Sequence, residues 1–104
     1  MRRFILHSYL KPEKVEEYVE LHRNTWPEVL DLISKTNITN YSISIKGNEL
    51  FTYYEYVGDD YEADMKIQDD SPIMQEWWKH TTPCFLYHDK GHYYDELEEI
   101  FYLK

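Results

Sequence analysis

The 104-residue sequence lacks several features that would place it in common functional classes. It contains a single cysteine, Cys84, so no internal disulfide can form, and we expect a protein of the reducing cytoplasm. Basic residues are scarce, 11 against 20 acidic ones, and the net charge of −9 argues against binding to nucleic acid or to an anionic membrane surface. The apolar run near the start is short and interrupted by His7, so we expect neither a signal peptide nor a membrane span there.

Motifs for phosphate, metal and nucleophilic chemistry are also missing. The sequence has no phosphate-binding loop and no dinucleotide fingerprint. His88 and His92 have the spacing of a helical zinc pair, but the residues between them, which include Gly91, indicate a loop, and no further ligand pair completes the set. Cys84 has no evident base to activate it. We therefore predict no metal site and no cysteine nucleophile.

Aromatic residues are abundant, at 17% of the chain, and 11 residues are tyrosine. Tyrosine suits positions that are apolar at one end and wet at the other, such as interfaces and ligand pockets. The strand preference of aromatic residues accounts for some of them equally well. A chain of this length is expected to form one domain, residues 1–104, with a modest core.

Hydrophobic periodicity predicts six main elements in the order βαββαβ. The predicted strands cover residues 2–10, 41–46, 50–57 and 98–103, and predicted helical segments begin at Pro12, Thr25, Tyr61 and Ser71. Pro27 interrupts the first helix, where Thr25 and Glu28 form a T-x-x-E capping box for a restart or a kink. The order indicates an α+β, ferredoxin-like fold, with an antiparallel sheet and the helices on one face.

The opposite face of such a sheet needs a cover, and no predicted element is left to provide one. A second copy of the chain is the simplest cover. Two sheets packed face to face would form a homodimer, a dimeric α/β barrel with room for a pocket.

His22 is the sharpest functional candidate because it lies on the apolar face of the first helix. Tyr18 precedes it by four residues, so the two side chains are neighbours. An imidazole can give and take a proton near neutral pH, and a tyrosine hydroxyl beside it can orient a substrate. A buried histidine paired with a backbone carbonyl or with Tyr18 explains the same pattern without a function.

Trp77 and Trp78 form the second candidate feature. Adjacent helical residues point about 100° apart, so one indole can enter the core while the other reaches an opening and packs on a sugar ring. Two core tryptophans are the alternative. Tyr41, at the start of the hairpin, can add a hydroxyl from the sheet, although most strand tyrosines contribute only packing.

The segments EEYVELHRNTWPEVL, NYSI, EYVGDDYEADM, WWK and LEEIFYL follow one another in that order along nearly the whole chain. This combination resembles the L-rhamnose mutarotase family. It implies a dimer that interconverts the α and β anomers of L-rhamnose without a cofactor. It also implies His22 as the proton donor, and a sugar site lined by Tyr18, Tyr41, Trp77 and Trp78. Thr82 stands where many relatives carry aspartate and residues 85–94 diverge, which leaves the choice between L-rhamnose and a close 6-deoxyhexose open.

The implied reaction would explain why an ionisable residue, His22, lies on the apolar face of a helix. Mutarotation requires the ring oxygen to gain a proton and the anomeric hydroxyl to lose one. We expect His22 to protonate the ring oxygen, while a tyrosine hydroxyl or a water could accept the anomeric proton. A cofactor-free, monooxygenase-like barrel enzyme and a non-catalytic sugar-binding module are the alternatives, and the fold alone does not separate them.

Overall fold

The computed structural model describes residues 1–87 and 93–104 and contains one four-stranded antiparallel sheet. The strands are β1 (Arg2–Tyr9), β2 (Ile38–Lys46), β3 (Glu49–Tyr56) and β4 (Tyr94–Glu96), and their order across the sheet is β2-β3-β1-β4. The first strand therefore pairs with both β3 and β4 and lies inside the sheet. This arrangement confirms the predicted α+β, ferredoxin-like class.

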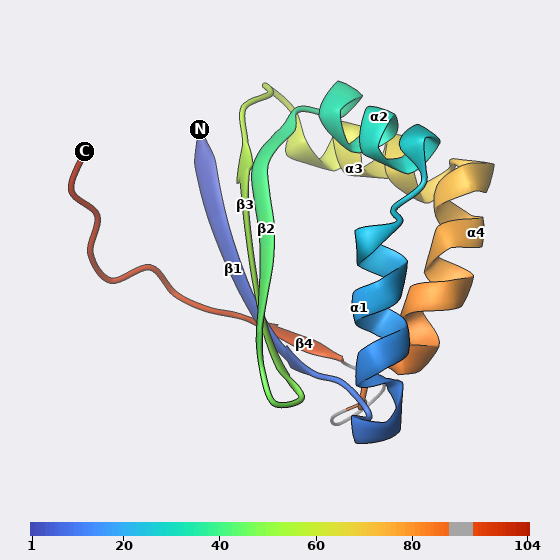
Figure 1. Cartoon of the computed structure of the whole chain (residues 1–104). Coiled ribbons are helices and arrows are strands. Elements are labelled where there is room, and N and C mark those ends of the chain that lie inside the picture. The colour runs from blue at the N-terminus through green and yellow to red at the C-terminus, as the bar shows by residue number, and fades with distance from the viewer. Residues whose placement is uncertain (88–92) are drawn as a thin grey trace.

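Four helices cover one face of the sheet (Figure 1). They are α1 (Val15–Arg23), α2 (Pro27–Lys35), α3 (Tyr61–Asp69) and α4 (Pro72–Thr81), with short 3₁₀ turns at Pro12–Lys14 and Thr82–Cys84. The predicted starts of α3 and α4 are confirmed, because Asp60 accepts a hydrogen bond from the Ala63 amide and Ser71 accepts one from the Met74 amide. No helix in the described part of the chain lies on the opposite face (Figure 1).

The strand register determines which side chains face the helices. Phe4, Leu6 and Ser8 of β1 lie opposite Tyr54, Thr52 and Leu50 of β3. Because side chains alternate along a strand, these positions point toward the helices, and Arg3, Ile5 and His7 point to the other face. The buried hydrophobic residues fall into three clusters, centred on Leu10 with Leu50, on Phe4 with Tyr56, and on Val29 with Trp77.

The predicted interruption near Pro27 is confirmed as a complete break, but the predicted capping box is wrong. The second helix begins at Pro27 with Trp26 as its N-cap, and no side chain caps it. Thr25 instead donates its hydroxyl to the carbonyl of His22, 2.9 Å away. The reason lies in the proline, which disfavours helical geometry at the residue before it and so moves the cap position from Thr25 to Trp26.

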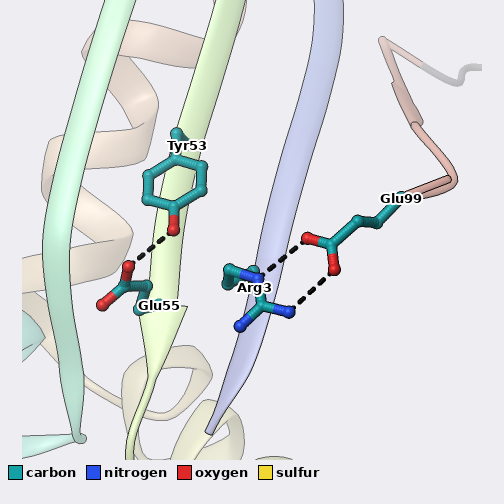
Figure 2. Close-up of polar contacts among 4 residues, drawn as sticks. All are labelled: Arg3, Tyr53, Glu55 and Glu99. Atoms are coloured by element: carbon teal, nitrogen blue, oxygen red, sulfur yellow. Dashed lines mark hydrogen bonds and ion pairs between the residues drawn. The ribbon is translucent and has the colours of Figure 1, made fainter. Parts of the chain in front are cut away.

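The predicted last strand over residues 98–103 is also wrong, because β4 ends at Glu96 and residues 97–104 form no regular element. The apolar side chains that suggested a strand are exposed, Ile100 at 92%, Phe101 at 79% and Leu103 at 81%. Arg3 holds the segment beside β1 through two hydrogen bonds to Glu99, at 2.8 and 2.7 Å (Figure 2). A strand was expected because apolar side chains of this kind are usually buried in a sheet. Among the described residues no element packs over the side chains of Ile100, Phe101 and Leu103, and they stay exposed.

Gly58 has no room for a side chain, because neighbouring atoms already fill the space beside its Cα. A substitution there should therefore lower stability. An added Cβ would collide with the Tyr56 hydroxyl and lie 2.8 Å from Asn37 Nδ2. The Tyr56 hydroxyl cannot move freely, since it bonds to Asp64 at 2.5 Å and to the Asp60 amide at 2.9 Å. We expect Gly58→Ala to lower the free energy of unfolding by about 1–3 kcal/mol in urea denaturation.

Gly47→Asn is the matched control. Gly47 has a φ of 62° but nothing within 4 Å of its missing Cβ, and asparagine tolerates that conformation. Its unfolding free energy should change by less than about 0.5 kcal/mol. Equal losses in the two variants would contradict the steric explanation.

Candidate active site

The five residues singled out in the sequence line one cavity of about 240 Å³ between the sheet and the helices. Tyr18 and His22 come from α1, Tyr41 from β2, and Trp77 and Trp78 from α4. Segments far apart in the sequence therefore converge on one space. A second opening of about 470 Å³ adjoins it at the edge of β2 and shares His22, Tyr41 and Trp77 as its walls.

His22 is half-buried and held by its own helix. Its Nδ1 lies 2.9 Å from the carbonyl oxygen of Tyr18, one helical turn earlier. The imidazole also contacts the ring of Tyr18, with centroids 4.2 Å apart, and the edge of Trp77, at 5.5 Å. The backbone pairing considered from the sequence is thus present. It uses one ring nitrogen only, and the ring still borders the cavity.

The surroundings of His22 favour its neutral form. Burial lowers the pKa of His22 below its usual range, and the hydrogen bond to the Tyr18 carbonyl opposes that shift only in part. The imidazole is therefore uncharged at pH 7. A neutral imidazole can accept a proton from a bound molecule and return it, which a permanently charged one cannot.

The tyrosines around the cavity stay protonated as well. Desolvation raises the pKa of Tyr18, Tyr54 and Tyr93 above the usual value. Although Tyr41 is 47% exposed as a residue, desolvation of its phenol raises its pKa to about 12. These phenols can donate and accept hydrogen bonds, but they do not supply a phenolate base near neutral pH.

The two tryptophans divide as the sequence suggested. Trp77 is only 5% exposed and packs in a core cluster with Val29 and Met74, while its ring meets the edge of Trp26 at 5.1 Å. Trp78 is half-buried. Both rings border the cavity, so the core tryptophan is at the same time a wall of the site.

Sequence reasoning missed several polar residues that line the cavity. Three are buried hydroxyl residues, Ser8, Thr52 and Thr81, and the others include Tyr54, Gln68, Tyr93 and Tyr94. Ser8 carried a usable signal, because it interrupts the apolar alternation of β1 as His22 interrupts that of α1. Thr82, the position that departs from many relatives, also lines the cavity.

Two other candidates lie away from the cavity. Cys84 is fully buried outside the lining, and its thiol lies 3.3 Å from Glu17. Burial and that carboxylate raise the pKa of Cys84 to about 11, which keeps the thiol protonated. His88 and His92 lie outside the described residues, and within those residues no group of three His, Cys, Asp or Glu side chains could hold a metal ion.

The cavity is polar without being charged. Among the residues that the structure describes, its lining contains no Asp, Glu, Lys or Arg. Hydroxyl, amide and indole groups can bind the hydroxyls of a neutral ligand, and the aromatic faces can pack against its C–H surface. The arrangement therefore suits a small, uncharged, polyhydroxylated molecule next to one histidine that can exchange protons.

Comparison with known proteins gives the family. The model of the L-rhamnose mutarotase family matches residues 3–103. The chain belongs to the L-rhamnose mutarotase family. The L-rhamnose mutarotase of Listeria monocytogenes serovar 1/2a is 33% identical over 99% of both chains, and that of Oceanobacillus iheyensis is 34% identical over 96% of this chain and 94% of its own.

A solved structure agrees with the fold of this family member. The crystal structure of L-rhamnose mutarotase from Formosa agariphila superposes over 100% of both chains with a TM-score of 0.79. The two sequences are 24% identical, so this likeness supports the fold alone.

Because Trp77 and Trp78 are buried to different extents, we expect their removal to lower the free energy of unfolding by different amounts. Trp77→Ala should lower the free energy of unfolding by about 3–5 kcal/mol, because a filled core position is emptied. Trp78→Ala should cost less than half as much, because its truncation mainly widens an existing cavity. Chemical denaturation of both variants measures the difference, and a larger loss for Trp78→Ala would contradict the assignment of Trp77 to the core.

Proposed function

We propose that the chain is a mutarotase that interconverts the α and β anomers of L-rhamnose, or of a close 6-deoxyhexose, without a cofactor. Membership of the mutarotase family supports the reaction class. The observation that carries the proposal is a neutral histidine at the wall of an uncharged, aromatic cavity. Anomer exchange needs proton transfer at neutral pH and little else, and this cavity offers a group suited to it.

The proposed site residues divide three tasks among them. His22 donates the proton that the ring oxygen needs when the hemiacetal opens. Tyr18 and Tyr41 bind sugar hydroxyls, and the indoles of Trp77 and Trp78 pack against the ring. Apolar wall residues suit the 6-methyl group of a deoxyhexose, among them Leu6, Ile33 and Phe85.

Removing the imidazole tests this function directly. We expect His22→Ala to slow catalysed anomer exchange by 10²–10⁴-fold, the usual contribution of one positioned acid–base group. Saturation-transfer NMR on the anomeric protons of L-rhamnose measures the rate. His80→Ala is the matched control, since His80 is exposed on α4 and does not line the cavity.

Sugar binding is measured in parallel by tryptophan fluorescence. If the wild-type chain binds L-rhamnose without accelerating anomer exchange, the protein is a sugar-binding module and not an enzyme. An unimpaired exchange rate in His22→Ala would remove His22 from the mechanism.

We also propose that the sheet face without helices is covered by a second copy of the chain. Ile5, Phe51 and Leu97 are partly exposed on this face, and a groove of about 260 Å³ runs between β1 and the segment 97–101. Beside them stand the exposed Ile100 and Phe101. Apolar side chains exposed on an uncovered sheet face are typical of an interface, and a sheet packed on its own copy gives a closed two-fold dimer.

Two further observations bear on where this dimer acts. None of the described helices has the length and apolar character that a bilayer span requires. The single cysteine is a free, buried thiol, which is compatible with a reducing compartment. We propose a cytoplasmic location, which the free thiol supports.

The dimer proposal predicts a mass of twice 12.8 kDa in sedimentation equilibrium. The double variant Ile100→Asp, Phe101→Asp should raise the dissociation constant more than about tenfold, because charges cannot be buried unpaired in an interface. Ile67→Asp, at an exposed position of α3 on the helical side, is the control and should leave the mass unchanged. A monomeric wild-type chain, or a control that dissociates equally, would overturn this interface.

A further inference from the structure

The hydrogen bond between His22 and the Tyr18 carbonyl determines which nitrogen of the imidazole carries the hydrogen. A backbone carbonyl oxygen accepts hydrogen bonds and cannot donate them. Nδ1, 2.9 Å from that oxygen, must therefore carry a hydrogen. In the neutral ring Nε2 then has none, and Nε2 is the nitrogen left for the cavity. A neutral His22 in this tautomer has no proton to give to a sugar until it has taken one.

No other described group of the cavity can act as the first base. The lining lacks carboxylates and amines among the residues that the structure describes. Four of its phenols hold their protons, because burial raises the pKa of Tyr18, Tyr41, Tyr54 and Tyr93. Serine, threonine and glutamine side chains do not ionise near pH 7.

We propose that Nε2 of His22 both removes the anomeric proton and delivers it to the ring oxygen, so that one nitrogen performs both proton transfers. This inference rests on the proposed function and assigns the acceptor that the sequence left open. The anomeric oxygen and the ring oxygen are bonded to the same carbon. A single nitrogen can therefore reach both with a small displacement.

The step balances without any other reactant. Nε2 takes the proton of the anomeric hydroxyl, and the electrons of that O–H bond form the C1=O double bond as the bond from C1 to the ring oxygen breaks. The ring oxygen keeps the pair of the broken bond and takes the proton from Nε2, which leaves an open-chain aldehyde and a neutral imidazole. Rotation about C1–C2 presents the other carbonyl face. The reverse transfers then close the opposite anomer.

The same contact supports the charged intermediate. While Nε2 holds the extra proton the ring is an imidazolium, and the Tyr18 carbonyl accepts a stronger hydrogen bond from Nδ1. The backbone of Tyr18 is thus a positioning group, independent of its side chain. Substituting the phenol leaves the tautomer unchanged.

The proposal predicts a one-sided pH profile. Titratable groups that face His22 or share its cavity are Tyr18 on its own helix, Tyr41 on β2, Tyr54 on β3, Tyr93 just before β4, and Tyr94 in β4. Trp77 from α4 does not titrate. Protonation of His22 blocks the first transfer, so kcat/KM should fall tenfold per pH unit below the pKa of His22 and stay level from pH 7 to 9. A separate acid with a pKa in that range would add a falling basic limb.

The deciding experiment reads the tautomer without using activity. Full-length protein labelled with ¹⁵N in histidine is studied at pH 7.5 by long-range ¹H–¹⁵N correlation, with His22→Gln to assign the signals. We expect a protonated Nδ1 and an unprotonated Nε2. Hydrogen on Nε2 in an enzyme that still exchanges anomers would overturn the shuttle and leave the mutarotase function standing. Absence of catalysed exchange in the wild-type chain would overturn both.

Removal of single hydroxyls gives an independent check. Tyr18→Phe and Tyr41→Phe should raise KM for L-rhamnose, because each phenol binds a sugar hydroxyl. Their kcat at saturating sugar should stay within about tenfold of wild type, because neither phenol transfers a proton in this scheme. A loss of 10²–10⁴-fold in either variant, with sugar binding retained, would identify that phenol as the second proton-transfer group and overturn the proposal.

Discussion

The chain has to place a hydrophobic core and a ligand cavity in the same layer, between one sheet face and one set of helices. A chain of this size buries only roughly 60–70% of its unfolded surface, so each polar side chain turned inward displaces an apolar one. The result is a divided core, in which the cavity takes walls from all three buried clusters. Tyr18 and Trp77 belong to the core and to the site together.

Desolvation acts on His22 and on four tyrosines of the cavity, Tyr18, Tyr41, Tyr54 and Tyr93, in the same sense, toward the neutral form. It raises the pKa of the tyrosines and lowers that of His22. No acidic residue in the described part of the chain lines the cavity. An uncharged wall suits a neutral sugar. It also leaves His22 as the group whose two protonation states are closest in free energy near pH 7.

The sequence predicted those features whose cause is local. The alternation in β1 and the hairpin of β2 and β3 follow from neighbouring residues, and so does the interruption at Pro27. His22 stood out because an ionisable side chain broke an apolar helical face. Ser8 breaks the strand pattern in the same way, so the same criterion applied to strands would have found it.

The features that the sequence predicted wrongly or missed depend on tertiary contacts, which a local sequence pattern does not contain. The segment 98–103 has strand composition, but whether it pairs depends on surface that must come from elsewhere in the fold or from another chain. Tyr54 and Gln68 reach the cavity only because tertiary packing brings β3 and α3 to the same space that α1 borders. No spacing in the sequence relates these positions to His22.

The break at Pro27 connects local backbone chemistry to the site. In a continuous helix, residue 26 would stand one turn beyond His22 on the same face, and its indole would cover the imidazole. The proline instead forces Trp26 into an extended conformation, with φ −62° and ψ 134°, and its ring packs against Trp77 at 5.1 Å. Trp26 lines neither opening beside His22. The proline therefore keeps the imidazole uncovered and, through Trp26, supports the indole that contacts it.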